Sequence, residues 1–440
     1  MRITFVQPPN LQRKGKWKMQ LVCRTPTNLA LLAAYVRMHG HEPQIIDLDI
    51  QGGTLEEIAH LILANDPHVI GITCLTPRFP ITIDIAAECK RINPDVIIVV
   101  GGSHVTGLPR FALKSPVIDY AIMSEGEEAF LELIDKLDKN KSVNEIANLV
   151  YRHNGEVRIN PVRPPIADLD KLPFPAWDLL MLDRYVDPAF YHGPHLGLVF
   201  GRGCPYECYF CASRVVWGRR VRHRSPSNVI AEIEEAVVKY HIREFMFYDD
   251  TFTLNRKYII EFCESIIPKH LDIRFYAQVR VDTIDTEIVK KLKAAGCFAV
   301  AIGVESGNAE ILKGMGKRLT KEQIREGCKV LKAAKMPFLA SYIIGHPGDT
   351  HETIMQTINF ANELDADQSK FLISTPYPGT RFFDMAVERG IISQEGAEDL
   401  GEHTYFQHVA ANLSAVSDAD LIAYQQKAYD DYDQRKRPLV

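Results

Sequence analysis

Three cysteines lie close together in the segment GRGCPYECYFCASRVVWG, residues 201–218: Cys204, Cys208 and Cys211. Thiolates bind soft metals, and a structural zinc ion takes four ligands in a closed tetrahedron. A zinc site here would need a distant fourth ligand, for which His192 and His223 are the candidates. A [4Fe–4S] cluster held by three cysteines instead keeps one iron open to a substrate. The spacing therefore favours a cluster with an open iron.

The cysteines follow the first of six apolar segments that alternate with amphipathic helical patterns, such as 226–241 and 321–334. The six predicted strands are 196–201, 244–250, 274–282, 299–306, 337–345 and 369–375. Alternating strands and helices form a TIM-type barrel when eight units are present, and such barrels carry their chemistry at the carboxyl ends of the strands. Six units predict an incomplete (β/α)6 barrel, open on one side, with the cysteines at its carboxyl end.

Residues 1–135 also alternate strand and helix patterns, as in the helix expected at 28–40. The predicted strands are 2–7, 43–49, 69–75, 96–102 and 119–126. Strands that are apolar throughout indicate a parallel sheet covered on both faces, with ligands at its carboxyl edge. The predicted class is α/β throughout. Its parts are a doubly wound domain (1–150), a docked connector with seven prolines (151–195), the partial barrel (196–390) and a short helical tail (391–440).

Composition narrows the class of protein. The net charge is −5, and no long block of like charges suggests a nucleic-acid partner. The basic stretch 217–225 could be a local basic patch or a solvated loop edge. No apolar run approaches the roughly 18 residues of a membrane helix, and the N-terminus does not read as a signal peptide. Six of the nine cysteines are scattered, which is not a disulfide framework, and a cytoplasmic protein is expected: Cys23, Cys74, Cys89, Cys263, Cys297 and Cys328.

The pattern C-x-x-x-C-x-x-C, with the aromatic Phe210 before its last cysteine and at the first loop of a βα barrel, resembles the radical S-adenosylmethionine (SAM) superfamily. The resemblance implies that the open iron chelates the amino and carboxylate groups of SAM. One electron then cleaves SAM to a 5′-deoxyadenosyl radical, which removes a hydrogen atom from the substrate. It also implies a low-potential electron donor such as flavodoxin or ferredoxin.

Later strand ends carry further motifs of the superfamily, namely FYDDTF, QVRVD, GVESG and IIGHPGDT. The residues that the resemblance places around SAM are Phe210, Asp249, Asp250, Arg280, Gly303, Glu305, Ser306, His346 and Pro347. Taken singly, each could instead serve a turn or a helix cap. No general base stands out. Four tyrosines near strand ends are candidates for the substrate pocket: Tyr248, Tyr276, Tyr342 and Tyr377.

The whole chain resembles the class of this superfamily with an N-terminal cobalamin-binding domain, on GGSHVTGLP, SEGEEAF, LDKLPFPAWDLL and WGRRVRHRSP. The implied cobalamin contacts, between the two domains, are Thr73, Leu75, Thr76, Arg78, Gly101, Gly102, Ser103, His104, Glu125, Gly126 and Glu127. Domains that ligate cobalt use D-x-H-x-x-G after the first strand. The loop at 7–20 has no histidine, and Arg78 is the candidate to face cobalt instead. Alternatively, the domain keeps the fold and binds no cobalamin.

The function expected is a cobalamin-dependent radical methyltransferase of anaerobic biosynthesis, which methylates an unactivated carbon. The short tail favours a small-molecule substrate over a protein. A rival on the same scaffold is a non-methylating radical reaction, such as cyclisation, ring contraction, deoxygenation or rearrangement. A rival of another class is a cobalamin-binding sensor whose cluster is structural.

Overall fold

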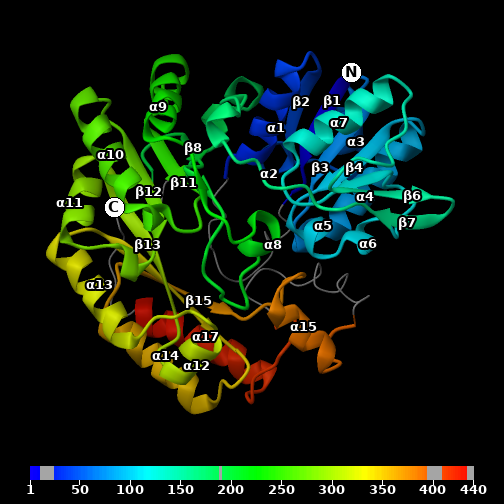
Figure 1. Ribbon diagram of the computed structural model, residues 1–440. Helices are drawn as coiled ribbons and strands as arrows, with labels where there is room; N and C mark the ends of the chain where they lie inside the picture. The colour runs from blue at the N-terminus through cyan, green and yellow to red at the C-terminus, as the bar shows by residue number, and fades with distance from the viewer. Residues whose placement is uncertain (10–23, 188–190, 394–408, 434–440) are drawn as a thin grey trace. The chain divides into compact units, whose positions relative to one another are not determined.

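The computed structural model describes residues 1–9, 24–187, 191–393 and 409–433, and the chain divides into two compact units (Figure 1). The first unit comprises Met1–Arg184, Ala212–Gly218 and Tyr377–Thr404. The second comprises Tyr185–Cys211, Arg219–Pro376 and Tyr405–Val440. Each unit is built on its own β-sheet, and the predicted α/β class is confirmed.

The sheet of the first unit has five parallel strands in the order β2-β1-β3-β4-β5, followed by an antiparallel hairpin, β6-β7. The strands are β1 (Arg2–Gln7), β2 (Glu42–Asp47), β3 (Val69–Thr73), β4 (Ile97–Gly101), β5 (Tyr120–Ile122), β6 (Leu149–His153) and β7 (Glu156–Ile159). All five predicted strands are present. The hairpin crosses the domain boundary expected at residue 150. Its turn is Asn154–Gly155, and both residues have positive φ, as a two-residue hairpin turn requires.

Neighbouring residues of β1 contact helices on the two faces of this sheet. The ring centroids of Phe5 in β1 and Phe130 in α7 lie 5.2 Å apart on one face. The next residue, Val6, belongs to the core that α3 and α4 cover on the other face. The helices are α1 (Thr27–Met38), α2 (Leu48–Gln51), α3 (Leu55–Leu63), α4 (Phe79–Ile92), α5 (Ser103–Gly107), α6 (Pro109–Ala112), α7 (Glu127–Asp138), α8 (Ser213–Trp217) and α15 (Arg381–Glu388). The domain is therefore doubly wound.

The proline-rich connector is docked onto α1, as its apolar residues predicted. The N–H of Ala176 donates to the carbonyl of Ala30 at 2.9 Å, and the side chain of Trp177 is buried. Arg37 of α1 forms a two-bond ion pair with Asp178, at 2.7 and 3.0 Å. These contacts hold the connector on the first unit.

The second unit is a sheet of six parallel strands in the order of the chain, with β8 and β15 at its two edges. The strands are β8 (His195–Leu198), β11 (Glu244–Phe247), β12 (Arg274–Val279), β13 (Cys297–Glu305), β14 (Phe338–Ile344) and β15 (Gln368–Ile373). The connecting helices are α9 (Pro226–Tyr240), α10 (Arg256–Ile266), α11 (Thr286–Ala294), α12 (Ala309–Gly314), α13 (Lys321–Ala333) and α14 (His351–Leu364). The incomplete barrel is confirmed, with two separate edges.

A C-terminal helix, α17 (Asp418–Asp433), covers the edge of β15. Gln425 donates to the carbonyl of Phe371 at 2.7 Å, and Tyr432 donates to the carbonyl of Asp367 at 2.6 Å. The hydroxyl of Tyr429 both accepts from the N–H of Phe371 and donates to its carbonyl. Side chains thus satisfy backbone groups that a further strand would otherwise pair with.

The scattered cysteines are core residues wherever the structure describes them. Cys74, Cys89, Cys263, Cys297 and Cys328 are buried, and Cys23 lies outside the described residues. Among the helices that the structure describes, none is long and apolar enough to cross a membrane.

Candidate functional site

The cysteines lie on a loop, residues 203–221, here called the cysteine loop. The two ends of this loop are joined by a two-stranded antiparallel ribbon, β9 (Gly201–Arg202) with β10 (Arg222–His223). Gly203 leaves the ribbon with φ +98°, and a Cβ there would lie 2.4 Å from the carbonyl oxygen of Arg220. Only glycine fits this position without a shift. Asp249, just after β11, accepts from the N–H groups of Phe200 at 2.9 Å and Gly201 at 2.6 Å. The segment that enters the cysteine loop is therefore hydrogen-bonded to the residue that follows β11 by two.

The two aspartates predicted to contact SAM have different surroundings. Both oxygens of Asp249 accept backbone N–H groups, and burial raises the pKa of this carboxyl to about 7. Asp250 is exposed, and its charge adds to the effect of burial in raising the pKa of the Cys204 thiol. Asp249 thus braces the cysteine loop, and Asp250 is the carboxylate near the first cysteine.

The segment between α12 and α13 contacts the middle of the cysteine loop. The N–H of Tyr209 donates to the carbonyl of Met315 at 3.1 Å, and the Cys208 Sγ lies 4.0 Å from the Gly316 carbonyl oxygen. Gly316 has φ +70°, and a Cβ there would lie 2.7 Å from the Glu207 carbonyl oxygen. A larger residue at position 316 would displace the loop.

Arg280, just after β12, contacts the loop between its first two cysteines. Its guanidinium carbon lies 3.5 Å from the centroid of the Tyr206 ring, a cation–π contact. The guanidinium donates to both oxygens of Asp282, at 2.9 and 3.0 Å, and to the carbonyl of Lys317 at 3.1 Å. Arg280 was predicted at the methionine carboxylate of SAM. In the structure it already has a carboxylate partner.

Glu305, at the end of β13, forms a buried ion pair with Lys317, with 2.6 Å between Oε1 and Nζ. The Glu305 backbone has φ +68°, a region that non-glycine residues rarely occupy and that costs about 1–3 kcal/mol. A Cβ at Gly303 would lie 2.2 Å from Glu305 Oε1 and 2.7 Å from Lys317 Nζ, so glycine leaves room for the pair. Sequence reasoning missed Lys317, because it follows a short helix and not a strand.

His346, just after β14, contacts the last turn of the cysteine loop. Its Nδ1 lies 2.9 Å from the Tyr209 hydroxyl and 3.3 Å from Ser374 Oγ, and its ring lies 5.5 Å from that of Phe210. Burial lowers the pKa of His346 to about 3, so the ring is neutral at physiological pH. Phe210 and His346, both predicted near SAM, are thus brought together.

Of the remaining predicted SAM residues, Ser306 serves the fold. Its hydroxyl lies 3.1 Å from that of Thr357 and accepts from the N–H of Asn308 at 3.1 Å. Pro347 is partly buried in the turn after β14. The carboxylate of Asp349 shapes this turn by accepting from the N–H groups of Gly345 and His346.

The four pocket tyrosines do not form one group. Tyr248 and Tyr276 belong to a cluster inside the second unit with Tyr191 and Met246. Tyr342 is fully buried and stacks on Phe371 at 5.0 Å, and Phe371 in turn meets Tyr429 of α17. Tyr377 belongs to the first unit. The packing of Tyr342 is that of a core residue, and a place in the substrate pocket stays a prediction for all four tyrosines.

Opposing effects act on the pKa of two of the thiols. Burial raises the pKa of Cys204 and Cys208, and the charges of Asp250 on Cys204 and of Glu305 on Cys208 add to this rise. The charges of Lys317 and Arg280 lower both pKa values and offset part of the rise. Cysteine must lose its proton to ligate metal, so these two cations act in favour of the ligating form. Three closely spaced thiols fit an iron–sulfur cluster by their chemistry.

The histidines weighed as a fourth zinc ligand have other surroundings. The N–H of His192 donates to Glu244 at the start of β11, whereas the cysteines follow the opposite end of the neighbouring β8. The His223 ring meets the rings of Phe200 and Tyr258. Across the described ranges, no group of three or more His, Cys, Asp or Glu side chains could hold a single metal ion.

In the first unit, the predicted cobalamin residues gather at the carboxyl edge of its sheet. The strand order reverses between β1 and β3, which is where open α/β sheets bind ligands. The loops after β3 and β4 are joined by their backbones, since Cys74 N–H donates to Gly101 and His104 N–H donates to Cys74. Gly102 has φ +112°, and a Cβ there would lie 2.7 Å from the Cys74 carbonyl oxygen.

Arg78 lies at this point of strand reversal. Its buried guanidinium donates to the carbonyl of Pro8, just after β1, and to Asp49 at 2.8 Å. The residue thus links the segments after β1, β2 and β3. Its predicted position facing cobalt remains a prediction, and most of the loop 7–20 lies outside the described residues.

His104 and Thr76 form a buried pair in the same edge. His104 Nδ1 lies 3.2 Å from Thr76 Oγ1, and the imidazole stacks on Phe79 at 4.3 Å. Burial lowers the pKa of His104 to about 4, so it is neutral. Thr73 accepts from Asn28 at 3.1 Å, and three further predicted residues lie partly buried in these loops: Leu75, Gly101 and Ser103.

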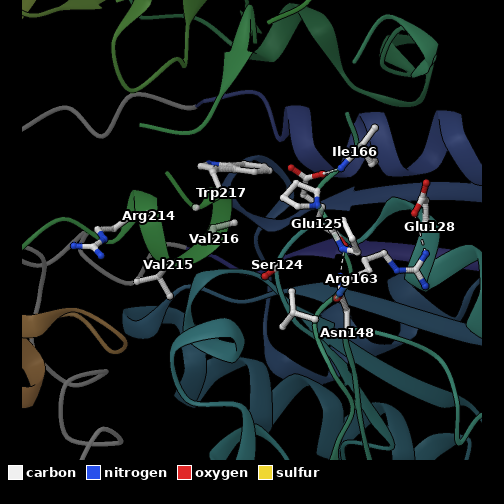
Figure 2. Close-up of a pocket in the computed structure, with 14 residues that line it drawn as sticks. Ser124, Glu125, Glu128, Asn148, Arg163, Ile166, Arg214, Val215, Val216 and Trp217 are labelled. Carbon is white, nitrogen blue, oxygen red and sulfur yellow. Dashed lines mark hydrogen bonds and ion pairs between the residues drawn. The ribbon is translucent and has the colours of Figure 1, made fainter. Parts of the chain in front are cut away.

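A cavity of about 150 Å³ in the first unit includes Glu125 in its wall (Figure 2). Glu125 Oε2 accepts from the N–H of Ile166 at 2.9 Å, and Arg163 pairs with Glu128 at 2.9 Å. Trp217 of α8 supplies part of the apolar wall. The neighbouring predicted residues Gly126 and Glu127 begin α7.

Two family models match the two units. The "Radical SAM superfamily" model covers residues 198–361, from the end of β8 into α14. The "B12 binding domain" model covers residues 22–134, which include α1 to α6 and the start of α7. The first range contains the parallel strands β11 to β14, and the second contains β2 to β5.

Similar proteins cover most of the chain. An uncharacterized methyltransferase of Pyrococcus horikoshii is 39% identical over 394 residues, 89% of this chain and 84% of that protein. An anaerobic magnesium-protoporphyrin IX monomethyl ester cyclase of Rubrivivax gelatinosus is 30% identical over 406 residues, 89% of this chain and 70% of that protein.

A solved structure has the same fold. It is the radical SAM methyltransferase TsrM of Kitasatospora setae with cobalamin and a [4Fe–4S] cluster bound, with a TM-score of 0.74, 19% identity, and coverage of 88% of this chain and 78% of that chain. The cofactors of the present protein are SAM, a [4Fe–4S] cluster and cobalamin. The chain belongs to the radical SAM superfamily, in the group of enzymes that also carry a B12-binding domain.

Proposed function

We propose that this enzyme is a cobalamin-dependent radical methyltransferase that methylates an unactivated carbon of a small molecule. The observation that carries the proposal is the three-cysteine loop at the carboxyl ends of the barrel strands, in a chain 39% identical to an uncharacterized methyltransferase of Pyrococcus horikoshii. When bound, the cluster and SAM supply a radical that abstracts hydrogen, and cobalamin supplies a methyl carrier.

The chain's own residues would bind and shield these groups. Cys204, Cys208 and Cys211 would ligate the cluster, and the Asp250 carboxylate would hold the methionine ammonium. Phe210 and the neutral His346, 5.5 Å apart, would provide an aromatic wall that keeps water from SAM. Arg280 would need to share its guanidinium between Asp282 and the methionine carboxylate, and Glu305 would need to share its carboxylate with Lys317.

In the first unit, the loops 73–78 and 101–104 and the segment 125–127 would hold cobalamin. The conformation of Gly102 and the absence of side chains at residues 101 and 102 leave backbone for a flat ligand to approach. Glu125, in the wall of the cavity, would accept hydrogen bonds from amide groups of the ligand.

A second function is a non-methylating radical reaction on the same scaffold. The observation in its favour is the 30% identity to a cyclase of Rubrivivax gelatinosus. Cyclisation uses the same cluster loop and the same SAM contacts, so the residues described above are compatible with either outcome.

The test is an anaerobic assay of the holoenzyme with SAM that carries a deuterated methyl group. The protein is reconstituted with iron, sulfide and hydroxocobalamin and incubated with dithionite and a small-molecule extract of its cells of origin. Mass spectrometry then measures 5′-deoxyadenosine, S-adenosylhomocysteine and labelled small molecules. Both nucleosides and a labelled product support methylation, whereas 5′-deoxyadenosine with an unlabelled new product supports the second function.

We further propose that the electron comes from flavodoxin or ferredoxin, that no nucleic acid is involved, and that the enzyme works in the cytoplasm. Replacing dithionite with reduced flavodoxin or ferredoxin in the same assay tests the first of these. If neither reduced flavodoxin nor reduced ferredoxin supports the formation of 5′-deoxyadenosine, that part of the proposal is contradicted.

A further inference from the structure

Two ion pairs, one buried and one partly exposed, lie next to the cysteine loop in the second unit. Lys317 and Glu305 are 8% and 9% exposed at their side chains, with 2.6 Å between the charged atoms. Arg280, 6% exposed at its side chain, pairs with Asp282 at 2.9 Å. The Arg280 guanidinium also donates to the Lys317 carbonyl, so the two pairs are joined into one network.

The network is close to the thiols on two sides. The residue before Lys317 is Gly316, whose carbonyl oxygen lies 4.0 Å from Cys208 Sγ. The Arg280 guanidinium lies on the ring of Tyr206, between the first two cysteines of the loop. The charge of Lys317 is the largest of the charge effects on Cys208, and it also reaches Cys204.

The Lys317–Glu305 pair is maintained against its intrinsic cost. Removing two charges from water carries a desolvation penalty that their attraction repays only with good geometry, and apolar side chains often stabilise such a position equally well. Glu305 also needs an unfavourable positive φ, and Gly303 is needed to leave room for both charged atoms. Strain of this kind concentrates at functional sites. Stability alone therefore does not account for the arrangement.

We propose that the Lys317–Glu305 pair sets the reduction potential of the [4Fe–4S] cluster, with Lys317 stabilising the reduced cluster and Glu305 limiting that effect. Reduction adds one electron, delivered by an external low-potential donor, and makes or breaks no bond to the chain. A buried cation nearby favours the added negative charge, because charges interact more strongly in a low-dielectric interior than in water. Cluster potentials respond to the local charge and to hydrogen bonding at the sulfurs.

The proposal makes the two members of the pair act in opposite directions. Lys317→Met leaves the Glu305 carboxylate near the cluster, so the potential falls. Glu305→Gln leaves Lys317 without its counter-charge, so the potential rises. The double variant restores the neutral balance and returns close to wild type. Both residues are positioning residues, since their effect passes through the cluster that the cysteines hold.

The experiment is an anaerobic redox titration of the cluster-loaded protein without SAM, followed by electron paramagnetic resonance. We expect each single variant to change the reduction equilibrium constant by about tenfold, which is about 59 mV for a one-electron couple. Lys317→Arg keeps the charge and is expected to keep the potential. Lys313→Met is the matched control, because Lys313 is exposed on α12 and its charge is screened by solvent.

Iron and sulfide content separates a loading defect from a shift of potential. If Lys317→Met fails to load a cluster, the sign of the Glu305→Gln shift still tests the proposal. Equal potentials in wild type and Glu305→Gln, or shifts of the same sign in both single variants, would overturn it. The inference rests on the cluster and not on methyl transfer, so a cyclase would show the same potentials.

Discussion

The carboxyl edges of the two sheets are held together in different ways. In the first unit, backbone groups join the loops after β3 and β4: the N–H of Cys74 donates to the carbonyl of Gly101, and the N–H of His104 donates to the carbonyl of Cys74. The buried Arg78 side chain links the segments after β1 and β2 to this edge. In the second unit, buried charged side chains such as Lys317 and Arg280 surround the cysteine loop. In the proposed function, the first edge presents backbone to cobalamin, and the second presents charge to a cluster that changes its own charge on reduction.

The largest effect is expected from the second edge. Cys208 is a proposed cluster ligand, so we expect SAM cleavage in Cys208→Ala to fall below detection while cobalamin binding by the first unit is retained. Cys328→Ala is the matched control, because Cys328 is a buried core cysteine away from the loop. The measurements are 5′-deoxyadenosine by mass spectrometry and bound cobalamin by absorbance. Undiminished SAM cleavage in Cys208→Ala would sink the cluster assignment.

The next effect tests the backbone-joined edge. Gly102→Ala places a Cβ 2.7 Å from the Cys74 carbonyl at a positive φ, which costs about 1–3 kcal/mol. We expect cobalamin affinity to fall at least about tenfold, since 1.4 kcal/mol corresponds to one decade. In Gly101→Ala the added Cβ would contact only the Ile122 carbonyl oxygen, at 3.6 Å, so we expect this variant to keep the wild-type fold. Equilibrium dialysis and urea unfolding measure both variants, and wild-type affinity and stability in Gly102→Ala would contradict the account.

Each edge carries one buried neutral histidine, and these predict an acid-sensitive stability. In the unfolded chain a histidine takes up a proton below about pH 6.5. His346 resists protonation until about pH 3 and His104 until about pH 4, so the unfolded state gains protons first and stability falls as the pH drops from 6.5. The expected loss in the free energy of unfolding is on the order of 2–4 kcal/mol for each histidine.

Substitution separates the two contributions. His346→Asn is expected to flatten the acid dependence of the second unit only, and His104→Asn that of the first unit only. Hydrogen exchange of peptides from each unit, measured in urea at pH 4 and pH 7, reports the two units separately. An unchanged acid dependence in both variants would show that other groups carry it.

The smallest effect concerns the edges of the sheets that lack a strand partner. Tyr432→Phe removes the hydrogen bond from α17 to the carbonyl of Asp367, the residue before β15. We expect a loss of about 1 kcal/mol in the free energy of unfolding, the usual net value of one hydrogen bond. Thermal unfolding measures it. Tyr424→Phe, which removes an exposed contact to His351 at 3.0 Å, is the control, and an equal loss there would argue against a special role for the β15 edge.

Much of the fold could be predicted because parallel strands covered by helices leave a continuous apolar pattern. All eleven predicted strands are present, with ends that differ by a few residues. The β6–β7 hairpin was missed because the proline-rich composition after residue 150 obscured its Asn154–Gly155 turn signal. The cysteine loop could be found because its ligands are close in sequence.

The network around that loop could not be predicted in the same way. Lys317 reaches the site through a segment after a short helix, and nothing in its local sequence marks it as buried. Asp249 was predicted as a SAM contact because FYDDTF resembles the superfamily's motif at this strand end, and that contact stays a prediction. Only the structure shows that both its oxygens accept backbone N–H groups. Long-range pairing decides such roles, and the local pattern does not record it.

The anchoring of the cysteine loop bears on how the enzyme survives oxygen. Gly203, Gly316 and Asp249 fix the loop through contacts that involve no metal. In small zinc domains, by contrast, metal binding supplies the free energy of folding. We therefore expect the loop to stay folded when the cluster is lost to oxidation. We expect damaged enzyme to be repaired by delivery of fresh iron and sulfide, without new synthesis of the chain.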